Sequence, residues 1–341
     1  MKVICRASVK ISAMKIFLRG VLLFACGLTA LPAFPVTLPG IPDFIDEMVE
    51  KHHFSRNELT LLFERANEDP RIIEAISRPA TIKPWPEYRA AFVNDNRIKP
   101  GLVFWNRYSK TLIRAEREYG VPREIIVALI GVETLYGQNA GGFRTIDALT
   151  TLAFDYPRRA VFFRDELENY LLLAREQQLD LLDVRSSYAG AMGIPQFMPS
   201  SYRKYAVDFN GNRKTDLFNE PVDAIGSVAN YLKEYGWIRG GLIAVRAQVG
   251  ESADARDGTR SLAEWAEAGV VPAVKIRRDE PARLLDYTVE QGKEYWLGFN
   301  NFDVITRYNN SDFYAMSVFQ LARALKAVRQ SKHKKLSINN Y

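Results

Sequence analysis

The sequence predicts an α+β protein that is mainly α-helical, with a small antiparallel sheet in its C-terminal half. Helical periodicity dominates to about residue 236, short β-branched and aromatic runs follow, and a helical pattern returns at 312–331. The 341 residues are 47% hydrophobic and 25% charged, which is a globular composition. A chain of this length can bury a core without disulfide or metal support.

Several segments carry the start, stop and spacing signals of amphipathic helices. Ser55 followed by Glu58 matches a capping box, which predicts that a helix begins there. Pro122 suits the first turn of a helix, and Gly120 and Gly236 suit helix ends. A Pro-rich stretch at 34–42 predicts an extended lead-in. The expected helices are 55–67, 101–119, 122–137, 158–178, 220–235 and 312–331.

From residue 238 onward, helical spacing gives way to short apolar runs separated by Gly, Pro, Asn and Asp. Such punctuation is typical of a small antiparallel sheet. Because a final helix follows these runs, we expect the strands to form a separate β lobe. The expected strands are Leu242–Val249, Ala273–Arg278, Leu284–Val289, Glu294–Phe299 and Val304–Tyr308.

The formal net charge of +6 comes mostly from the N-terminal leader. Five basic residues precede the first acid, Asp43, and removing these five from the 46 basic residues leaves 41 against 40 acidic ones. A nearly neutral chain argues against nucleic-acid binding driven by counterion release.

The cysteine and histidine positions exclude several catalytic classes. Both cysteines, Cys5 and Cys26, lie in the leader, so the rest of the chain has no disulfide, thiol nucleophile or zinc–thiolate site. The histidines, His52, His53 and His333, lie near the termini, which argues against a Ser-His-Asp triad or a His-rich metal centre. Carboxylates are therefore the natural candidates for acid–base chemistry.

The first 33 residues have the pattern of an export signal. Basic residues precede an apolar run at 21–31, and Ala33 suits the position before cleavage. The run is too short for a comfortable membrane span, and no second long apolar segment follows it. We therefore expect a signal peptide over 1–33 and a periplasmic protein whose mature chain has no transmembrane span. The alternative is an outer-membrane lipoprotein anchored through Cys26, because 23–26 resembles a lipoprotein cleavage box.

Glu133 is the strongest candidate for a catalytic carboxylate. The eight residues before it, 125–132, carry no charge and lie on a predicted helix. A carboxylate on so apolar a helix loses solvation, which raises its pKa. A raised pKa is what a general acid needs near neutral pH. The alternative is a structural glutamate at the helix end that is solvated or paired with an arginine.

The segment 186–202 concentrates small residues, an amide, aromatic rings and two prolines. Small residues let a ligand approach the backbone closely. Gln196 and the serines offer neutral hydrogen bonds, while the aromatic rings offer flat apolar faces. Neutral polar groups beside aromatic rings suit a sugar. A buried turn between two helices has the same composition and is the alternative interpretation.

The segment 208–216 resembles the start of a calcium loop, with oxygen-bearing side chains at positions 208, 210, 212 and 216. It departs from that pattern because Arg213 occupies the sixth position, where glycine is expected, and Asn219 occupies the twelfth. Asp223 is a candidate for the missing carboxylate. An Asx-rich loop without a metal is the alternative.

Taken together, these stretches resemble the membrane-bound lytic murein transglycosylase B family, glycoside hydrolase family 103. The resemblance covers residues 42–328 and consists of several long matches in the same order. The most specific stretches are Ile130-Gly131-Val132-Glu133-Thr134, residues 154–159, residues 189–193, residues 196–202, residues 223–231 and Ile305-Thr306-Arg307-Tyr308-Asn309.

The resemblance implies a lysozyme-like core at 116–237, a β lobe at 238–303, and an α lobe that combines 42–115 with 304–331. It implies that Glu133 is the single acid/base residue. The glycan-contacting positions of the family fall on Tyr88, Arg158, Arg159, Ser187, Gln196, Phe197, Tyr231, Tyr308, Asn309 and Tyr314. The family's calcium ligands, in an EF-hand-like loop at 208–223, fall on Asp208, Asn210, Asn212, the Lys214 carbonyl and Asp223. Amide ligands and one extra residue before Pro221 imply weak calcium binding.

The implied function is a lyase reaction on peptidoglycan in cell-wall turnover. The MurNAc-β-1,4-GlcNAc bond is cleaved without water and 1,6-anhydro-MurNAc ends remain. Peptidoglycan glycan strands are the expected partner, with other cell-wall enzymes as further partners. No cofactor is expected for catalysis, and calcium is expected only as a structural ion.

Two alternatives to this function remain open. A lysozyme-type hydrolase needs a second carboxylate, for which Asp147, Asp155 and Asp165 are candidates by position. A non-catalytic peptidoglycan-binding protein of the envelope is the other alternative, and a carboxylate on the apolar helix of Glu133 speaks against it.

Overall fold

The computed structural model describes residues 38–78, 83–254, 258–276 and 279–338, with side chains as far as Ser331. The predicted signal peptide at 1–33 lies outside these residues, as does the alternative lipid attachment site, Cys26. Of the Pro-rich stretch at 34–42, only the end is described, and a helix already begins at Ile41.

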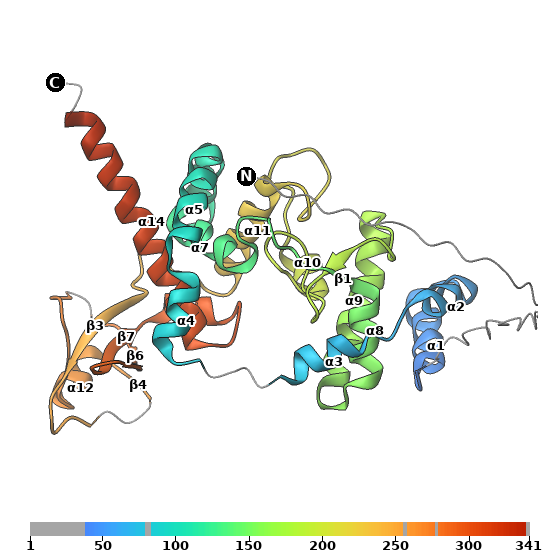
Figure 1. The fold of residues 1–341 in the computed structure, drawn as a ribbon, viewed down its shortest axis with the longest axis horizontal. Helices are drawn as coiled ribbons and strands as arrows, with labels where there is room; N and C mark the ends of the chain where they lie inside the picture. The colour runs from blue at the N-terminus through green and yellow to red at the C-terminus, as the bar shows by residue number, and fades with distance from the viewer. Residues whose placement is uncertain (1–37, 79–82, 255–257, 277–278, 339–341) are drawn as a thin grey trace, which may run out of the picture. The chain divides into compact units, whose positions relative to one another are not determined.

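Helices make up most of the described residues, as the predicted fold class requires (Figure 1). None of the helices in this part of the chain combines the length and apolarity that a membrane crossing needs. The helices are α1 (Ile41–His52), α2 (Arg56–Arg65), α3 (Pro70–Ser77), α4 (Trp85–Phe92), α5 (Asp95–Arg107), α6 (Ser109–Tyr119), α7 (Arg123–Thr134), α8 (Thr145–Asp155), the 3-10 turn η1 (Pro157–Arg159), α9 (Ala160–Gln177), α10 (Pro199–Tyr205), α11 (Pro221–Glu234), α12 (Leu262–Glu267), α13 (Asn300–Thr306) and α14 (Asp312–Ile338).

The strands form one small pair and one five-stranded antiparallel sheet. Strands β1 (Phe143–Arg144) and β2 (Arg185–Ser186) make the pair. The sheet has the order β4-β6-β7-β3-β5, and each neighbouring pair is antiparallel. Its strands are β3 (Ala244–Val249), β4 (Thr259–Arg260), β5 (Val270–Pro272), β6 (Ala282–Val289) and β7 (Gly292–Gly298). The strands expected at 242–249, 284–289 and 294–299 are therefore confirmed.

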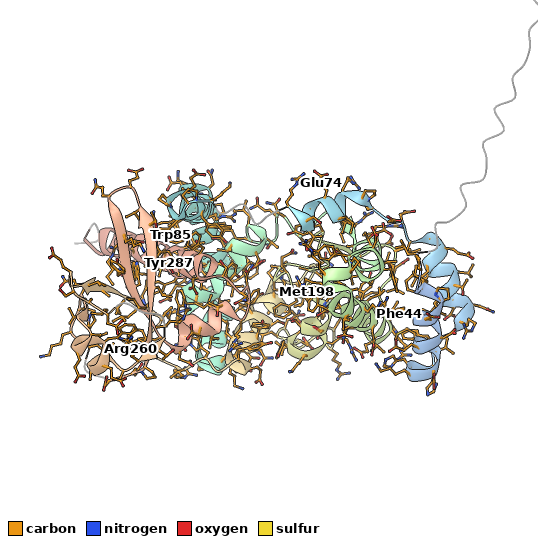
Figure 2. The ribbon with its side chains drawn as sticks, turned by 90° about the horizontal axis from the view of Figure 1, so that it is seen from below. Phe44, Glu74, Trp85, Met198, Arg260 and Tyr287 are labelled. Carbon is orange, nitrogen blue, oxygen red and sulfur yellow. The ribbon has the colours of Figure 1, made fainter. Side chains whose placement is uncertain are left out.

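The two faces of the five-stranded sheet belong to different hydrophobic clusters. Successive side chains of a strand point to opposite faces, and Trp296 packs in the main helical core while Leu297 packs with Trp265 of α12. Tyr287 on β6 stacks against Trp85 of α4, with ring centroids 4.6 Å apart (Figure 2). The sheet is thus attached to the helical body through aromatic side chains on one face.

Helix α7 lies at the centre of the main core. All of its residues from Ile125 to Val132 are buried, as expected for a helix that is apolar on every side. Helices α5, α11 and α14 contact it, and α14 runs beside it in Figure 1. Gly131 makes room for the ring of Tyr136, because a Cβ at Gly131 would lie 2.5 Å from the Tyr136 hydroxyl oxygen.

Three sequence predictions of secondary structure are wrong. The helix expected at 101–119 is divided at Tyr108 into α5 and α6. The first of these, α5, already begins at Asp95, so it starts before Pro100. Residues 304–306 of the strand expected at 304–308 end helix α13, which buries its apolar side chains against the core, and residues 307–308 form the turn that follows. Residues 273–276 of the strand expected at 273–278 are not a strand, since β5 lies earlier and pairs with β3, and residues 277–278 lie outside the described residues.

Candidate active site

Glu133 lies in the last turn of α7, at a tightly fixed end of the helix. The next two residues, Leu135 and Tyr136, have left-handed backbone angles, with φ of 50° and 64°. Such conformations cost energy for residues other than glycine and occur often at functional sites. Thr134 holds the turn, since its hydroxyl donates to the Ile194 carbonyl at 2.8 Å and accepts from the backbone N–H of Gly137 at 2.9 Å.

The carboxyl group of Glu133 is half-buried and has one hydrogen-bond partner among the described residues. The hydroxyl of Tyr314, a buried residue on α14, donates to its Oε1 atom. Burial raises the pKa of Glu133 to about 7, while the bond from Tyr314 and the positive charge of Arg97 act in the opposite direction. The expected rise in pKa is therefore present. Near neutral pH the carboxyl group can both hold and accept a proton.

Arg97 is a member of the site that the sequence did not point to. Its guanidinium group donates to the Gly131 carbonyl at 2.5 Å and to the Ala91 carbonyl at 3.2 Å. Its own carbonyl accepts the Tyr136 hydroxyl at 2.8 Å. These bonds fix a positive charge close to Glu133 without forming an ion pair with it in the part of the chain that is described. A single arginine at the start of a helix carries no sequence signal for such a role.

Several of the predicted glycan-contacting tyrosines gather around Glu133. The negative charge of Glu133 raises the pKa of Tyr88 and of Tyr308, in both cases after burial as the larger cause. The Tyr308 hydroxyl donates to the Pro195 carbonyl at 2.5 Å. The centroid of the Tyr308 ring lies 4.8 Å from that of the Tyr231 ring and 5.8 Å from that of the Phe197 ring. Phe197 and Tyr231 are only 2% and 6% exposed, so they offer little surface to a ligand.

The segment that carries Ser187 and Gln196 is tied to the end of α7 through the Thr134–Ile194 bond. The Ser187 hydroxyl oxygen accepts the backbone N–H groups of Ala189 and Ala191, at 3.2 and 3.1 Å, so its proton remains available to donate. Gln196 donates its amide to the Ala140 and Gly193 carbonyls, both at 3.0 Å.

At Gly193, one of the small residues in this segment, the backbone conformation and packing require glycine. Its φ of +68° is left-handed, and a Cβ there would lie 2.5 Å from the Leu217 carbonyl oxygen. The close packing of the backbone at this point requires glycine.

Three predicted site residues are not brought to Glu133 by any recorded contact in the described residues. Arg158 and Arg159 lie on η1 and are exposed, and the Arg159 guanidinium lies 4.4 Å from the centroid of the Phe162 ring. Asn309 is exposed in the turn after α13.

The acids considered for a hydrolase do not accompany Glu133. Asp147 forms an ion pair with Arg144 at 2.7 Å and accepts the backbone N–H of Asn67 at 2.8 Å. Asp155 on α8 and Asp165 on α9 are both exposed. A carboxylate close enough to act with Glu133 would raise its pKa by repulsion. Among the described groups, no carboxylate contributes to the pKa of Glu133.

The predicted calcium loop is held together by its own backbone hydrogen bonds. Asp223, at the first turn of α11, is fully buried and accepts the backbone N–H groups of Phe209, Asn210 and Asp216 at 2.9 to 3.1 Å. Asp208 accepts three more, from residues 211, 212 and 213. The amide oxygens of Asn210 and Asn212 accept the backbone N–H two residues ahead, at 2.9 and 2.8 Å.

The donor chemistry of this loop fits a hard cation. Within the described residues no group of three or more His, Cys, Asp or Glu side chains gathers as a metal site. The predicted set has instead two carboxylates, two amide oxygens and a carbonyl, all of them oxygen donors. Burial raises the pKa of Asp223, and the negative charge of Asp208 adds to that rise. A divalent cation would relieve the cost of this buried charge.

The chain is similar to known proteins over most of its length. Residues 39–323 match the family described as the transglycosylase SLT domain. The membrane-bound lytic murein transglycosylase B of Escherichia coli (strain K12) is 44% identical over 304 residues, which cover 85% of this chain and 84% of that protein.

Two crystal structures have the same fold as this chain. One is the soluble lytic transglycosylase SltB1 from Pseudomonas aeruginosa, with a TM-score of 0.81 and 48% identity over 86% of this chain and 100% of that one. The other is the E. coli lytic transglycosylase Slt35 in complex with calcium, with a TM-score of 0.81 and 44% identity over 86% of this chain and 94% of that one. The predicted α+β class with a lysozyme-like core is confirmed. The chain is an enzyme of the membrane-bound lytic murein transglycosylase B family.

Proposed function

We propose that this enzyme cleaves the MurNAc-β-1,4-GlcNAc bond of peptidoglycan without water and that Glu133 is its only acid/base group. One observation carries the proposal. Burial brings the pKa of Glu133 to about 7, and no second carboxylate among the described residues contributes to that value. A single group that is protonated in part near neutral pH can both donate and accept a proton, whereas hydrolysis by two carboxylates needs a partner.

In the first step, the protonated carboxyl group of Glu133 donates its proton to the glycosidic oxygen while the bond from that oxygen to C1 of MurNAc breaks. The GlcNAc part leaves as an alcohol. The positive charge that develops at C1 is shared by the carbonyl oxygen of the substrate's own N-acetyl group. Tyr314 and Arg97 stabilise the carboxylate that Glu133 becomes.

In the second step, the O6 hydroxyl of the same MurNAc attacks C1. The carboxylate of Glu133 takes the proton that O6 loses, so the residue returns to its starting state. The product carries a 1,6-anhydro ring, and no water is consumed. The Ser187 hydroxyl has no acceptor among the described residues and is proposed to donate to the N-acetyl oxygen. Arg158 and Arg159 are exposed cations, which suits contact with peptide or lactyl carboxylates.

The other predicted glycan contacts are proposed to act in two ways. Tyr88 and Tyr308 lie near Glu133 and are partly exposed, so they are the groups best placed to touch the sugar at C1, whereas the buried Tyr314 acts through its hydrogen bond to Glu133. The buried Phe197 and Tyr231 support Tyr308 from behind. Gln196 and Asn309 remain proposed contacts further along the glycan.

Digestion of purified sacculi tests this function. The products of the wild-type enzyme should carry 1,6-anhydro ends by mass spectrometry. Ends heavier by one water would refute the mechanism. Glu133→Gln should lose nearly all turnover and still bind glycan, because the amide keeps the shape of the side chain but cannot exchange a proton in this pH range. Asp155→Asn serves as the matched control at an exposed carboxylate and should retain turnover.

We also propose a structural calcium ion held by Asp208, Asn210, Asn212, the Lys214 carbonyl and Asp223. The fit of the oxygen donors supports it, as does the calcium complex of the E. coli relative. The ion would supply positive charge beside Asp223 and tie the loop to α11, with no part in the chemistry at Glu133. Two carboxylates among the ligands predict weak affinity, with a Kd of about 10⁻⁴–10⁻³ M.

The lobe boundaries and the location of the enzyme are further proposals. The second hydrophobic cluster lies wholly within 242–299, which supports a β lobe at 238–303. Contacts of α14 with α4 and α5 support an α lobe that joins 42–115 to 304–331, beside a core at 116–237. Export to the periplasm, or anchoring through Cys26, agrees with the membrane-bound relative.

A further inference from the structure

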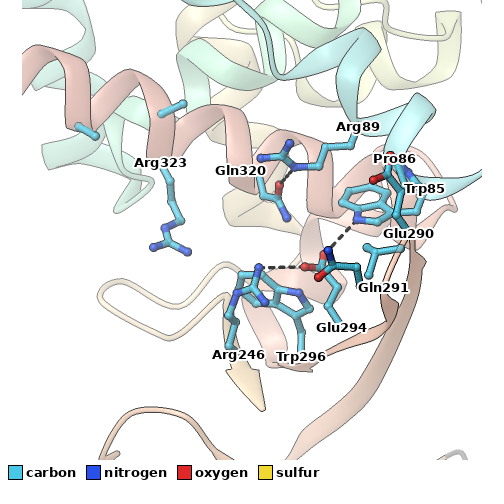
Figure 3. A pocket seen from close by; sticks show the side chains of 13 residues that line it. Trp85, Pro86, Arg89, Arg246, Glu290, Gln291, Glu294, Trp296, Gln320 and Arg323 are labelled. Carbon is cyan, nitrogen blue, oxygen red and sulfur yellow. Dashed lines mark hydrogen bonds and ion pairs between the residues drawn. The ribbon is translucent and has the colours of Figure 1, made fainter. Parts of the chain in front are cut away.

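A cavity of about 720 Å³ lies where helices α4 and α14 meet the five-stranded sheet (Figure 3). None of the predicted glycan-contacting residues lines it. Its volume is within the range of small-ligand sites, about 300–1,000 Å³. A second cavity of about 550 Å³ is bordered by three of the same side chains, Arg246, Trp296 and Arg323. This part of the surface therefore has cavities that are not part of the site around Glu133.

One wall of the larger cavity is a fixed polar network. Glu294 on β7 accepts the indole N–H of Trp85 at 3.0 Å and an N–H of Arg246 at 2.8 Å, as the dashed lines in Figure 3 mark. The Arg246 guanidinium also lies over the Trp296 ring, 4.9 Å from its centroid. These contacts neutralise Arg246 and hold both tryptophan rings in place. The indole N–H of Trp296 is buried and has no acceptor among the described residues.

The opposite wall carries cations that are not neutralised. Arg89 on α4 donates to the side-chain oxygen of Gln320 on α14, as a dashed line in Figure 3 marks. Arg323 lies one turn further along α14, with its guanidinium carbon 5.7 Å from the centroid of the Phe319 ring. Within the described residues, neither arginine has a carboxylate within 4 Å. Glu290 is the remaining acid at the rim, and it is exposed on the β6–β7 turn.

The side chains predict the chemistry of the ligand. Two arginines without carboxylate partners favour a carboxylate, because guanidinium groups bind carboxylates through paired hydrogen bonds. The tryptophan rings and the small side chains Ala324 and Ala327 give the rest of the cavity an apolar lining that suits a short peptide. A bare glycan strand offers only the lactyl carboxylates next to its sugar rings, without the peptide that the apolar lining would hold.

We propose that this cavity binds the carboxylate-bearing peptide stem of peptidoglycan, at a site separate from the one that cleaves the glycan. The identity of the peptide rests on the proposed function, whereas the preference for a carboxylate rests on the cavity itself. The helices α4 and α14 connect the two places, since α4 carries Tyr88 as well as Arg89, and α14 carries Tyr314 as well as Arg323.

Binding of an N-acetylated stem peptide with free carboxylates, measured by NMR titration on the whole enzyme, tests the proposal. The wild type should bind it, and the fully amidated peptide should bind at least about tenfold more weakly. The double variant Arg89→Gln/Arg323→Gln should raise the Kd about tenfold. Ala327→Trp should also block binding, with both arginines in place, because the indole fills the cavity. Arg78→Gln on α3 is the matched control at an exposed arginine and should leave the Kd unchanged.

Turnover separates this proposal from the proposed function. The double variant should cleave peptide-free glycan at the wild-type rate, while its KM for peptide-bearing glycan rises about tenfold. Failure of the wild type to cleave either glycan would contradict the proposed function and leave the binding data to stand alone. Equal binding of the acid and the amide, or wild-type binding by the double variant and by Ala327→Trp, would overturn the cavity proposal. Loss of binding only in Arg158→Gln would place the peptide at the active site and overturn it as well.

Discussion

The hydrogen bond from Tyr314 to Glu133 should set the pH range of the enzyme, and Tyr314→Phe removes it. The bond stabilises the carboxylate, because the hydroxyl donates to Oε1, and it therefore lowers a pKa that burial raises to about 7. A hydrogen bond to a charged group contributes about 1.5–3 kcal/mol. One pKa unit corresponds to about 1.4 kcal/mol, so the pKa of Glu133 should rise by about 1–2 units in the variant.

The direction of the shift in the pKa of Glu133 can be measured directly. The free enzyme must carry a protonated Glu133 to begin the reaction, so kcat/KM falls as pH rises through the pKa of that group. In Tyr314→Phe the alkaline limb should therefore move upward by about 1–2 pH units, even though the rate at the plateau falls with the loss of stabilisation of the carboxylate. Initial rates on soluble glycan chains, read by mass spectrometry between pH 4 and 10, give the profile.

The matched control is Tyr119→Phe, which removes a hydroxyl on α6 that does not contact Glu133. Its alkaline limb should coincide with that of the wild type. The reasoning is refuted if the limb of Tyr314→Phe stays in place or moves to lower pH, because the hydroxyl would then not stabilise the carboxylate.

Three further predictions concern stability. The pKa of Glu133 is about 7 in the folded protein and about 4.5 in the unfolded chain, so its ionisation lowers the stability of the fold as pH rises from 4.5 to 7. In thermal melts, Glu133→Gln should therefore be more stable than the wild type at pH 8, by about 1–3 kcal/mol. At pH 4 the two proteins should be equally stable. Millimolar calcium should raise the melting temperature of the wild type but not of Asp208→Ala, and identical wild-type curves with calcium and with a chelator would contradict the metal site. Glu166 is buried and accepts hydrogen bonds from the backbone N–H and the hydroxyl of Ser200 at the start of α10. Glu166→Ala should lower the free energy of unfolding by about 1–3 kcal/mol. Asp165→Ala, at an exposed position, is the control and should leave that free energy unchanged.

The parts of the fold and site that sequence reasoning found depend on local patterns. Glu133 is conspicuous because an uncharged run of residues precedes it on the same helix, and burial of that helix is what raises its pKa. The strands β3, β6 and β7 are recognisable for a similar reason, since each is a short run with β-branched or aromatic residues, and Gly, Pro, Asn and Asp separate these runs.

The parts that were missed depend on contacts between distant residues or on short ambiguous runs. Tyr314 is 181 positions from Glu133, and Trp85 is 209 positions from Glu294. The residues alone did not indicate either contact, and Tyr314 was identified only through the family resemblance. The run 304–308 is apolar in both the strand and the helix pattern, and the packing of Val304 and Ile305 against the core selects the helix.

The spacing of Tyr314 and Arg323 on α14 leads to a last prediction about the peptide stem. They are nine positions apart, which at 1.5 Å per residue is about 13.5 Å along the helix axis. An extended peptide covers about 3.3–3.6 Å per residue, so roughly four residues are needed to reach from a sugar at Glu133 to Arg323. If the stem in the cavity belongs to the sugar being cleaved, the effect of Arg323→Gln on KM should be present for stems of four or five residues and absent for stems of two. An equal effect on short and long stems in steady-state assays with defined soluble substrates would show that the stem comes from a neighbouring sugar or strand. No dependence on Arg323 at any length would contradict a role for the cavity in turnover.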